Sequence, residues 1–414
     1  MGLRYAAGQH VNLLERALTV TMTPPPDTGY PIANLWDGRP ARLVRHNSNA
    51  ADPSITADLA AFDGGMGGWI GGVPAGWTKV TTGTGTFIET TTVGEYVTSP
   101  AAKGNPGTGT AQQSRDIIVR AGERRRISIS MRRAGSGTGR LSVQNLYTKK
   151  FLAAAGASWS AAQAFVLSDN TNTTHTTQAA DYTVEDMAAC QSPIVRLRLT
   201  LDAGGTGDSM YDDVADWPRW NALEVHGHNL DPGLVVELRS STDGFVGSNV
   251  LQQTGAILQP SFFIAAPATV NHRHVRLQLT GTNQEAAWYG EVVPCFLETA
   301  LKAQNWNFEV RYKEDQIRNQ GRLGITHVSN LAPIFRRLLK MSFEQTVTEE
   351  AELRHEIVWR CRGGAYPLLV VPIEGETMVL YIRLDDSWAV VREFTSHFLD
   401  DLTGSEDPVA APLA

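Results

Sequence analysis

Trp220–Leu230 reads WNALEVHGHNL, and with the earlier stretches Ala33–Gly38 (ANLWDG) and Ser54–Leu59 (SITADL) it decides the fold of this chain. Polar and apolar residues alternate along Ser54–Leu59, as they do later along Val275–Thr280. Such alternation is typical of a strand with one buried face. We interpret the early and late stretches as two halves of one β-sandwich. The residues between them, near 62–216, are then expected to form a separate domain inserted into a loop.

Taken together, these stretches and Ala287–Val292 (AWYGEV) resemble a discoidin-like jelly-roll domain of the kind found in tailed-phage structural proteins. The turn Gly227-His228-Asn229-Leu230 is the most specific of the shared motifs. The resemblance implies a discontinuous sandwich that comprises residues 1–61 and 216–299. It also favours a multi-module binding protein over an enzyme with one pocket.

The composition fits a β-rich protein made in a reducing compartment. A length of 414 residues suggests two to four domains, and the 38 glycines favour short strands joined by turns. The net charge of −7 makes duplex nucleic acid an improbable partner, because phosphate backbones are bound by clustered basic residues. The three cysteines fall one to each expected domain, so a disulfide framework is not expected.

No targeting or membrane segment is expected from the sequence. No apolar run reaches the length of a membrane span, so membrane insertion is not expected. The stretch Met1–Tyr5 leads into no signal-peptide apolar core. The chain is therefore expected to be made in a cytoplasm and not to be secreted by a signal of its own.

Residues 62–215 resemble the jelly-roll carbohydrate-binding modules that are attached to many glycoside hydrolases. Short alternating bursts such as Arg126–Met131 and Ile194–Thr200 are separated by Gly, Ser, Asn and Thr turns, which is typical of antiparallel sheets. The resemblance rests on the order of five landmarks: Phe62-Asp63, Pro74–Trp77, Ser128–Arg133, Trp159 and Gly207–Val214.

Sugar binding requires flat aromatic faces for the C–H groups of a pyranose and polar groups for its hydroxyls. The glycan-binding candidates are Trp69, Trp77, Tyr96, Tyr147 and Trp159. Trp69 lies among glycines, so we expect it to be an exposed platform. Trp77 and Trp159 match positions that are usually core in the related modules. Ordinary packing in the core or at its rim is the alternative for all five.

Two kinds of metal site can be considered. Asp213 with Asp63 could bind a structural Ca²⁺ through oxygen, as the resemblance implies, whereas the alternative is a solvated acidic pair, Asp212-Asp213, at a strand end. The histidine pairs His226/His228 and His272/His274 each share one strand face, a geometry that can hold a transition metal. For His228, an imidazole that hydrogen-bonds the backbone of its turn is a sufficient account. No known catalytic motif occurs, and no enzymatic activity is expected.

Residues 300–414 are expected to form a third, small α+β domain. Trp306–Tyr312 and Ile334–Phe343 are predicted strands, Thr346–Trp359 has helical spacing, and Met378–Arg383 is a further strand. An acidic tail is expected at Asp400-Asp401 and Glu406-Asp407. The pattern resembles the tail domains by which phage tail proteins form rings, which implies a homo-oligomer.

The fold class expected is thus mainly β, with two jelly-roll sandwiches, one inserted into the other, and a small α+β domain. The leading hypothesis is a virion protein at the distal tail or baseplate of a tailed phage, in contact with other tail proteins, whose inserted module binds host-surface glycan for adsorption. One alternative is a purely architectural tail or decoration protein that binds only virion subunits. A glycan-cleaving enzyme is a third possibility, but it needs convergent carboxylates that the sequence does not reveal.

Overall fold

A computed structural model describes residues 4–7, 12–37, 42–45, 52–62, 64, 66–97, 100–258, 261–283, 286–299, 306–320, 326–346, 357, 360–361, 366–371, 380–384, 389–394 and 397–406. The chain is mainly β and is built from antiparallel sheets, as the sequence predicts. It divides into two compact units, residues 1–58 with 220–414 and residues 59–219. Among the described residues, no helix is long and apolar enough to span a membrane.

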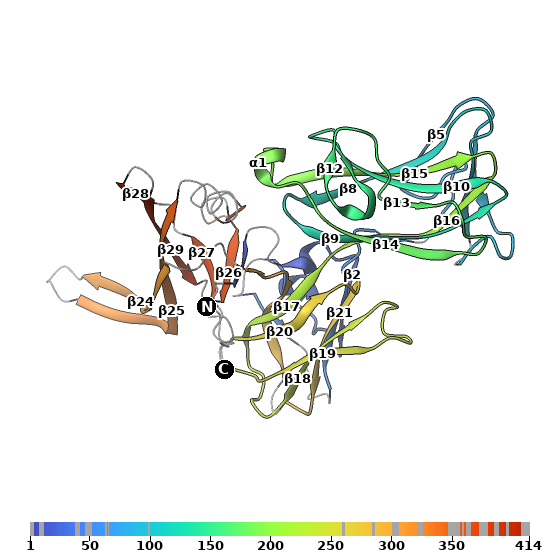
Figure 1. The fold of residues 1–414 in the computed structure, drawn as a ribbon. Helices are drawn as coiled ribbons and strands as arrows, with labels where there is room; N and C mark the ends of the chain where they lie inside the picture. The colour runs from blue at the N-terminus through green and yellow to red at the C-terminus, as the bar shows by residue number, and fades with distance from the viewer. Residues whose placement is uncertain are drawn as a thin grey trace. The chain divides into compact units, whose positions relative to one another are not determined.

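The first unit contains a four-stranded and a five-stranded sheet, built from segments on both sides of residues 59–219 (Figure 1). The pair β4–β21 aligns Ile55 with Leu277, and β22 aligns Tyr289 with Val44 of β3. The four-stranded sheet has the order β20 (Ser261–Val270), β17 (Trp220–His228), β22 (Trp288–Cys295) and β3 (Val44–Arg45). The five-stranded sheet has the order β19 (Val250–Gly255), β18 (Val235–Ser241), β21 (His274–Thr280), β4 (Ser54–Asp58) and β2 (Thr19–Thr23).

Two short 3-10 helices, η2 (Leu13–Arg16) and η3 (Ile32–Leu35), accompany these sheets. In the turn that follows β17, the imidazole of His228 hydrogen-bonds the backbone, as the sequence predicts. His228 Nε2 donates to the carbonyl of Leu258 at 3.1 Å, and its Nδ1 accepts from the amide of Leu230 at 3.2 Å. Gly227 has a φ of 74°, a conformation that strains residues with a side chain.

A third sheet of this unit joins the amino terminus to the carboxy-terminal region. Its order is β23 (Glu298–Thr299), β1 (Arg4–Ala7), β26 (Pro367–Val371), β27 (Leu380–Leu384), β29 (His397–Glu406), β25 (Thr326–Thr346) and β24 (Trp306–Gln320), and β28 (Ala389–Phe394) pairs with β29. Leu369, Val371 and Tyr381 share one hydrophobic core with Ala222 and Val293. Residues of the carboxy-terminal region therefore pack directly against β17 and β22.

The strands expected at Trp306–Tyr312 and Ile334–Phe343 lie within β24 and β25. Asp400, Asp401 and Glu406 belong to β29, so the expectation of an acidic tail is wrong for them. Backbone pairing explains the difference: Asp400 and Asp401 pair with β25 and β28, and Glu406 pairs with Ile382 of β27. Most of the helix expected at Thr346–Trp359 lies outside the described residues.

The second unit, residues 59–219, is a sandwich of two antiparallel sheets (Figure 1). Sheet F has the order β12 (Trp159–Ser160), β11 (Phe151–Leu152), β10 (Gly137–Asn145), β15 (Ile194–Gly205), β8 (Ala111–Arg120) and β5 (Thr78–Thr81), with β13 (Leu167–Asp169) also paired to β10. Sheet G has the order β14 (Thr176–Thr183), β9 (Arg124–Ala134), β16 (Asp208–Pro218), β7 (Ala101–Asn105) and β6 (Thr86–Thr90). The helices η4 (Ala154–Gly156) and α1 (Met187–Cys190) are short.

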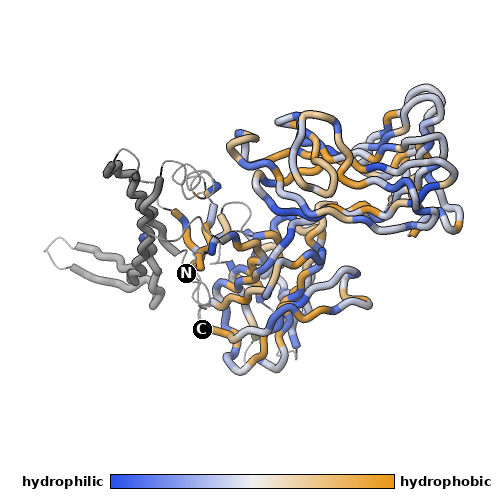
Figure 2. Tube along the Cα trace, viewed as in Figure 1, coloured by the Kyte–Doolittle hydropathy of each residue, from blue (hydrophilic) through white to orange (hydrophobic). Residues whose placement is uncertain are grey.

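The core of this unit lies between the two sheets. Val195, Leu197, Leu199 and Leu201 of β15 are buried, and the residues between them are more exposed. Figure 2 shows hydrophobic and hydrophilic residues alternating along such strands. The alternation expected of antiparallel sheets with one wet face is therefore confirmed for this segment.

A buried polar network closes the end of the unit where the chain enters and leaves it. The guanidinium of Arg125 contacts Asp216 at 2.5 Å and Glu123 at 2.9 Å, and the hydroxyl of Tyr182 donates to Asp216 at 2.6 Å. The amide of Ala61 in the entering segment donates to the carbonyl of Asp216. The network thus joins β9, β14 and β16, and the entering segment at Ala61 is bonded to β16, the last strand of the insertion.

Candidate glycan-binding site

Two of the five aromatic candidates belong to the packed interior of residues 59–219. Trp77 is 7% exposed and meets Phe62 edge-on, with ring centroids 6.4 Å apart. Trp69 is partly buried and packs against the same core. The expected exposed platform at Trp69 is therefore wrong. The glycine-rich segment folds back on itself through the bridge between Ile70 and Val73, which places the indole on the core instead of in solvent.

Trp159 and Tyr96 are both half-buried, and Trp159 lies on a strand whereas Tyr96 lies in a connecting segment. Trp159 of β12 packs against the core and meets Tyr182 at 6.5 Å between ring centroids. Its indole Nε1 donates to the carbonyl of Thr183 at 2.9 Å. Tyr96 lies in the segment between β6 and β7. Neither ring offers a fully open face.

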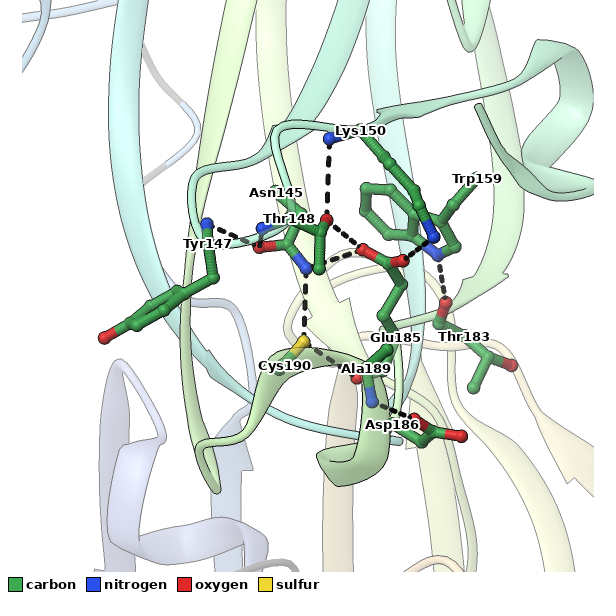
Figure 3. Close-up of polar contacts among 10 residues, drawn as sticks. All are labelled: Asn145, Tyr147, Thr148, Lys150, Trp159, Thr183, Glu185, Asp186, Ala189 and Cys190. Carbon is green, nitrogen blue, oxygen red and sulfur yellow. Dashed lines mark hydrogen bonds and ion pairs between the residues drawn. The ribbon is translucent and has the colours of Figure 1, made fainter. Parts of the chain in front are cut away.

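Tyr147 is the candidate whose side chain is open to solvent, with 55% of the residue exposed. It lies in the turn between β10 and β11, and in Figure 3 its ring points away from Lys150, Glu185 and Trp159. The five candidates therefore do not converge on one platform, and Tyr147 is the ring best placed to stack on a sugar.

The turn that carries Tyr147 is held by the side chain of Asn145, which is fully buried. Its Oδ1 accepts from the amides of Tyr147 at 2.9 Å and Thr148 at 3.4 Å, while its Nδ2 donates to Glu185 at 2.8 Å and to Cys190 Sγ at 3.3 Å (Figure 3). A side chain that hydrogen-bonds amides two and three residues ahead is a common way to fix a turn.

Glu185 is the second anchor of the turn. Its carboxylate accepts hydrogen bonds from Asn145 and from the hydroxyl of Thr148, and it forms an ion pair of 2.9 Å with Lys150. The hydrogen bond to Glu185 raises the pKa of Lys150. Burial raises the pKa of the Cys190 thiol, which donates to the carbonyl of Glu185 at 3.5 Å. These contacts hold the Tyr147 backbone in one conformation before any ligand arrives.

Asn145 and Glu185 were not predicted as site residues. Asn145 directly follows the alternating strand Leu141–Gln144, and an Asn at such a position is a turn signal. Glu185 lies forty residues further along the chain. Nothing in the local sequence indicates that the two side chains meet, so only the fold reveals this contact.

The described residues include only one of the two predicted calcium ligands. Asp63 lies outside the described residues, so the calcium site of Asp63 and Asp213 stays a prediction. Asp213 has a φ of 48° at a β-bulge. Asp212 is fully buried and accepts from the amide of Val97 at 2.8 Å, so the solvated acidic pair is wrong for this residue. The bulge interrupts β16 between Asp212 and Ala215, and the Asp212 carboxylate is bonded to the segment that contains Val97.

The histidine pairs are accounted for by contacts within the protein. His226 is buried beside Glu224 at 3.4 Å and against the ring of Tyr381, and His272 contacts the hydroxyl of Ser240 at 2.7 Å. Burial lowers the pKa of His228 to about 4, which keeps the imidazole neutral. Within the described part of the chain, no group of three or more His, Cys, Asp or Glu side chains could hold a metal ion.

Comparison with known proteins gives no family for this chain. No protein-family model matches it, and no curated protein matches it. One similar structure is the enzymatically active domain of tailspike protein 4 from bacteriophage CBA120. The match has 13% identity and a TM-score of 0.26, and it covers 35% of this chain and 19% of the tailspike chain.

Two further similar structures contain CBM22 modules. For the CBM22-1–GH10 modules of xylanase 10B from Clostridium thermocellum, the identity is 14% and the TM-score 0.26, with 34% of this chain and 26% of that chain covered. For the CBM22 tandem domain of Xyn10C from Paenibacillus barcinonensis, the identity is 10% and the TM-score 0.27, with 58% of this chain and 98% of that chain covered. Similarities at this level assign no function to the chain.

Proposed function

We propose that residues 59–219 form a carbohydrate-binding module, and that the Tyr147 turn is where the sugar stacks. The observation that carries the proposal is the combination of a solvent-exposed aromatic ring with a turn fixed from below by Asn145 and Glu185. A ring that is held in place before binding loses little conformational entropy when it meets a ligand, which favours affinity.

The whole chain is, in this proposal, a structural protein at the distal tail or baseplate of a tailed bacteriophage, located in the virion, that presents the module to host-surface glycan. The sequence pattern of Trp220–Leu230 and its companion stretches supports the assignment. Repetition of the module in a homo-oligomer would add weak glycan contacts through avidity. The role is one of binding, without catalysis.

Glycan-array binding by the full chain tests the proposal, with Tyr147→Ala as the informative variant. We expect the wild type to bind a defined set of glycans and Tyr147→Ala to lose roughly threefold to tenfold in affinity, because a stacked aromatic ring contributes about 0.5–1.5 kcal/mol beyond the area it buries. Val93→Ala is the control, because Val93 is exposed in the same unit but lies on the segment after β6. Equal binding by all three chains would reject the Tyr147 site.

The rival function is purely architectural, with jelly rolls that bind only other virion subunits. It predicts no glycan binding by the wild type, and it predicts that a change on a jelly-roll surface, such as Tyr147→Ala, impairs incorporation into particles. Particle incorporation of Tyr147→Ala separates the two functions. We expect the variant to assemble normally and to adsorb poorly to host cells, whereas failure of assembly would favour the architectural role.

A further inference from the structure

The backbone of sheet F and of the Tyr147 turn places four residues near Tyr147, and with Tyr147 we call them the Tyr147 surface: Ile118, Lys149, Ile194 and Arg196. The backbone pairing brings them together. Arg196 of β15 lies opposite Ile118 of β8, and the amide of Leu146 donates to the carbonyl of Arg196 at 3.0 Å. Lys149 follows Tyr147 by two residues in the same turn.

The Tyr147 surface combines apolar and cationic groups. Ile118 is 59% exposed and Ile194 is 37% exposed, and both side chains are on the face of sheet F opposite the core, because Ile117, Val119 and Val195 are buried. Lys149 and Arg196 are exposed. Within the described part of the chain, neither cation forms an ion pair.

Two acidic groups of this region carry their own cation: Glu185 pairs with Lys150, and Asp116 pairs with Arg198 at 2.8 Å. Asp186 accepts from the amide of Ala189 at 2.8 Å, which leaves its negative charge in place. The two positive charges of Lys149 and Arg196 exceed the single charge of Asp186, so the surface is locally cationic. The contrast with the chain as a whole is clear, because its net charge is −7.

We infer that the Tyr147 surface recognises an acidic glycan, whose sugar ring stacks on Tyr147 and whose anionic group is bound by Lys149 and Arg196. The inference rests on the proposed function and adds the class of ligand to it. A pyranose offers apolar C–H groups to the tyrosine and isoleucine side chains. A carboxylate or phosphate on that sugar accepts charge-assisted hydrogen bonds from the guanidinium and the ammonium.

Binding of the full chain to polygalacturonate, and to the same polymer after reduction of its carboxyl groups, tests the inference. A phosphomannan, whose phosphate is attached to a mannose ring, serves as the phosphate-bearing probe. We expect binding to at least one anionic polymer, and binding that weakens steeply as sodium chloride rises, because exposed charge pairs are screened by salt. Carboxyl reduction should abolish binding if the carboxylate is the anion recognised, whereas binding to the phosphomannan alone would identify phosphate.

Arg196→Gln and Lys149→Gln should each lower the affinity roughly threefold to tenfold, as loss of a charge-assisted hydrogen bond would. Lys79→Gln is the matched control and should bind like wild type, because it removes a cation from β5, where Lys79 pairs with Gln113, five residues along β8 from Ile118. Equal losses in all three variants would show non-specific attraction and overturn the inference.

The failures of the two proposals can be told apart. If the chain binds neutral glycans, or the carboxyl-reduced polymer as well as the acidic one, then the acidic-glycan inference is wrong and the glycan-binding function stands. If no glycan on an array or among these polymers binds, the proposed function fails and the inference fails with it.

Discussion

The hydroxyl of Tyr381 donates a hydrogen bond of 2.7 Å to the carboxylate of Glu291, and both side chains are buried within the first unit. His226 lies opposite Glu291 on the paired strand and contacts the ring of Tyr381, with centroids 5.2 Å apart. Glu224 precedes His226 by two residues, on the same face of β17. The carboxy-terminal strand β27 is thus joined to β17 and β22 through ionisable groups as well as apolar ones.

This cluster makes the stability of the first unit depend on pH. Burial raises the pKa of Glu291 from its ordinary 4.5 to about 7. Between these values the folded state holds a proton that the unfolded state releases, so the free energy of unfolding falls as pH rises, by about 3 kcal/mol in total. Thermal melts at pH 5, 6, 7 and 8 should show this decline. Glu291→Gln should flatten it, and Glu237→Gln, at a partly exposed position, should leave it unchanged. A decline of the same size in all three chains would assign it to other groups.

Asn145→Ala should destabilise the inserted unit by about 1–3 kcal/mol. It removes the hydrogen bond that Asn145 donates to Glu185 and the two that it accepts from turn amides, all in a buried site. Gln144→Ala is the neighbouring control, since Gln144 makes one bond of 3.3 Å from a partly exposed position. Chemical denaturation measures both. The Asn145→Ala chain should also bind glycan more weakly, and unchanged affinity would mean that the fixed turn is not required.

Arg125 and Arg126 are adjacent but should respond very differently to substitution. Arg125→Ala leaves the buried carboxylates of Asp216 and Glu123 without their cation, so a loss of about 3–5 kcal/mol is expected. Arg126 pairs with Asp181 at the surface, and its removal should cost less than about 1 kcal/mol. Urea denaturation measures the free energy of unfolding that each variant loses. Similar losses in the two variants would refute the structural role given to the buried network.

The insertion should be removable. Joining Leu59 to Trp220 through a short Gly/Ser linker should leave a soluble, cooperatively folding protein, because β4–β21 and β17–β22 pair entirely through residues outside 59–219. Circular dichroism and size-exclusion chromatography report the outcome. A molten or aggregated product from this deletion would show that the first unit needs the inserted one.

Much of the β architecture was predictable because burial of one sheet face imposes strict alternation, as at Ile55 and Ala57 or along Val195–Leu201. The pairing of β4 with β21 was predicted from the resemblance to a discoidin-like sandwich, because alternation alone does not say which distant strands pair. The position of Trp69 was not, because glycine-rich segments can fold back in many ways. The bulge at Asp212 and the contact of Asn145 with Glu185 depend on tertiary packing, which residue order alone does not specify.

A crystal structure of the full chain with the best ligand from the glycan array tests the central claim most directly. The account predicts a sugar ring stacked on Tyr147, with its anionic group within hydrogen-bond distance of Lys149 and Arg196. A sugar bound at Trp69, at Tyr96 or on the outer face of sheet G, with the Tyr147 surface empty, would contradict it.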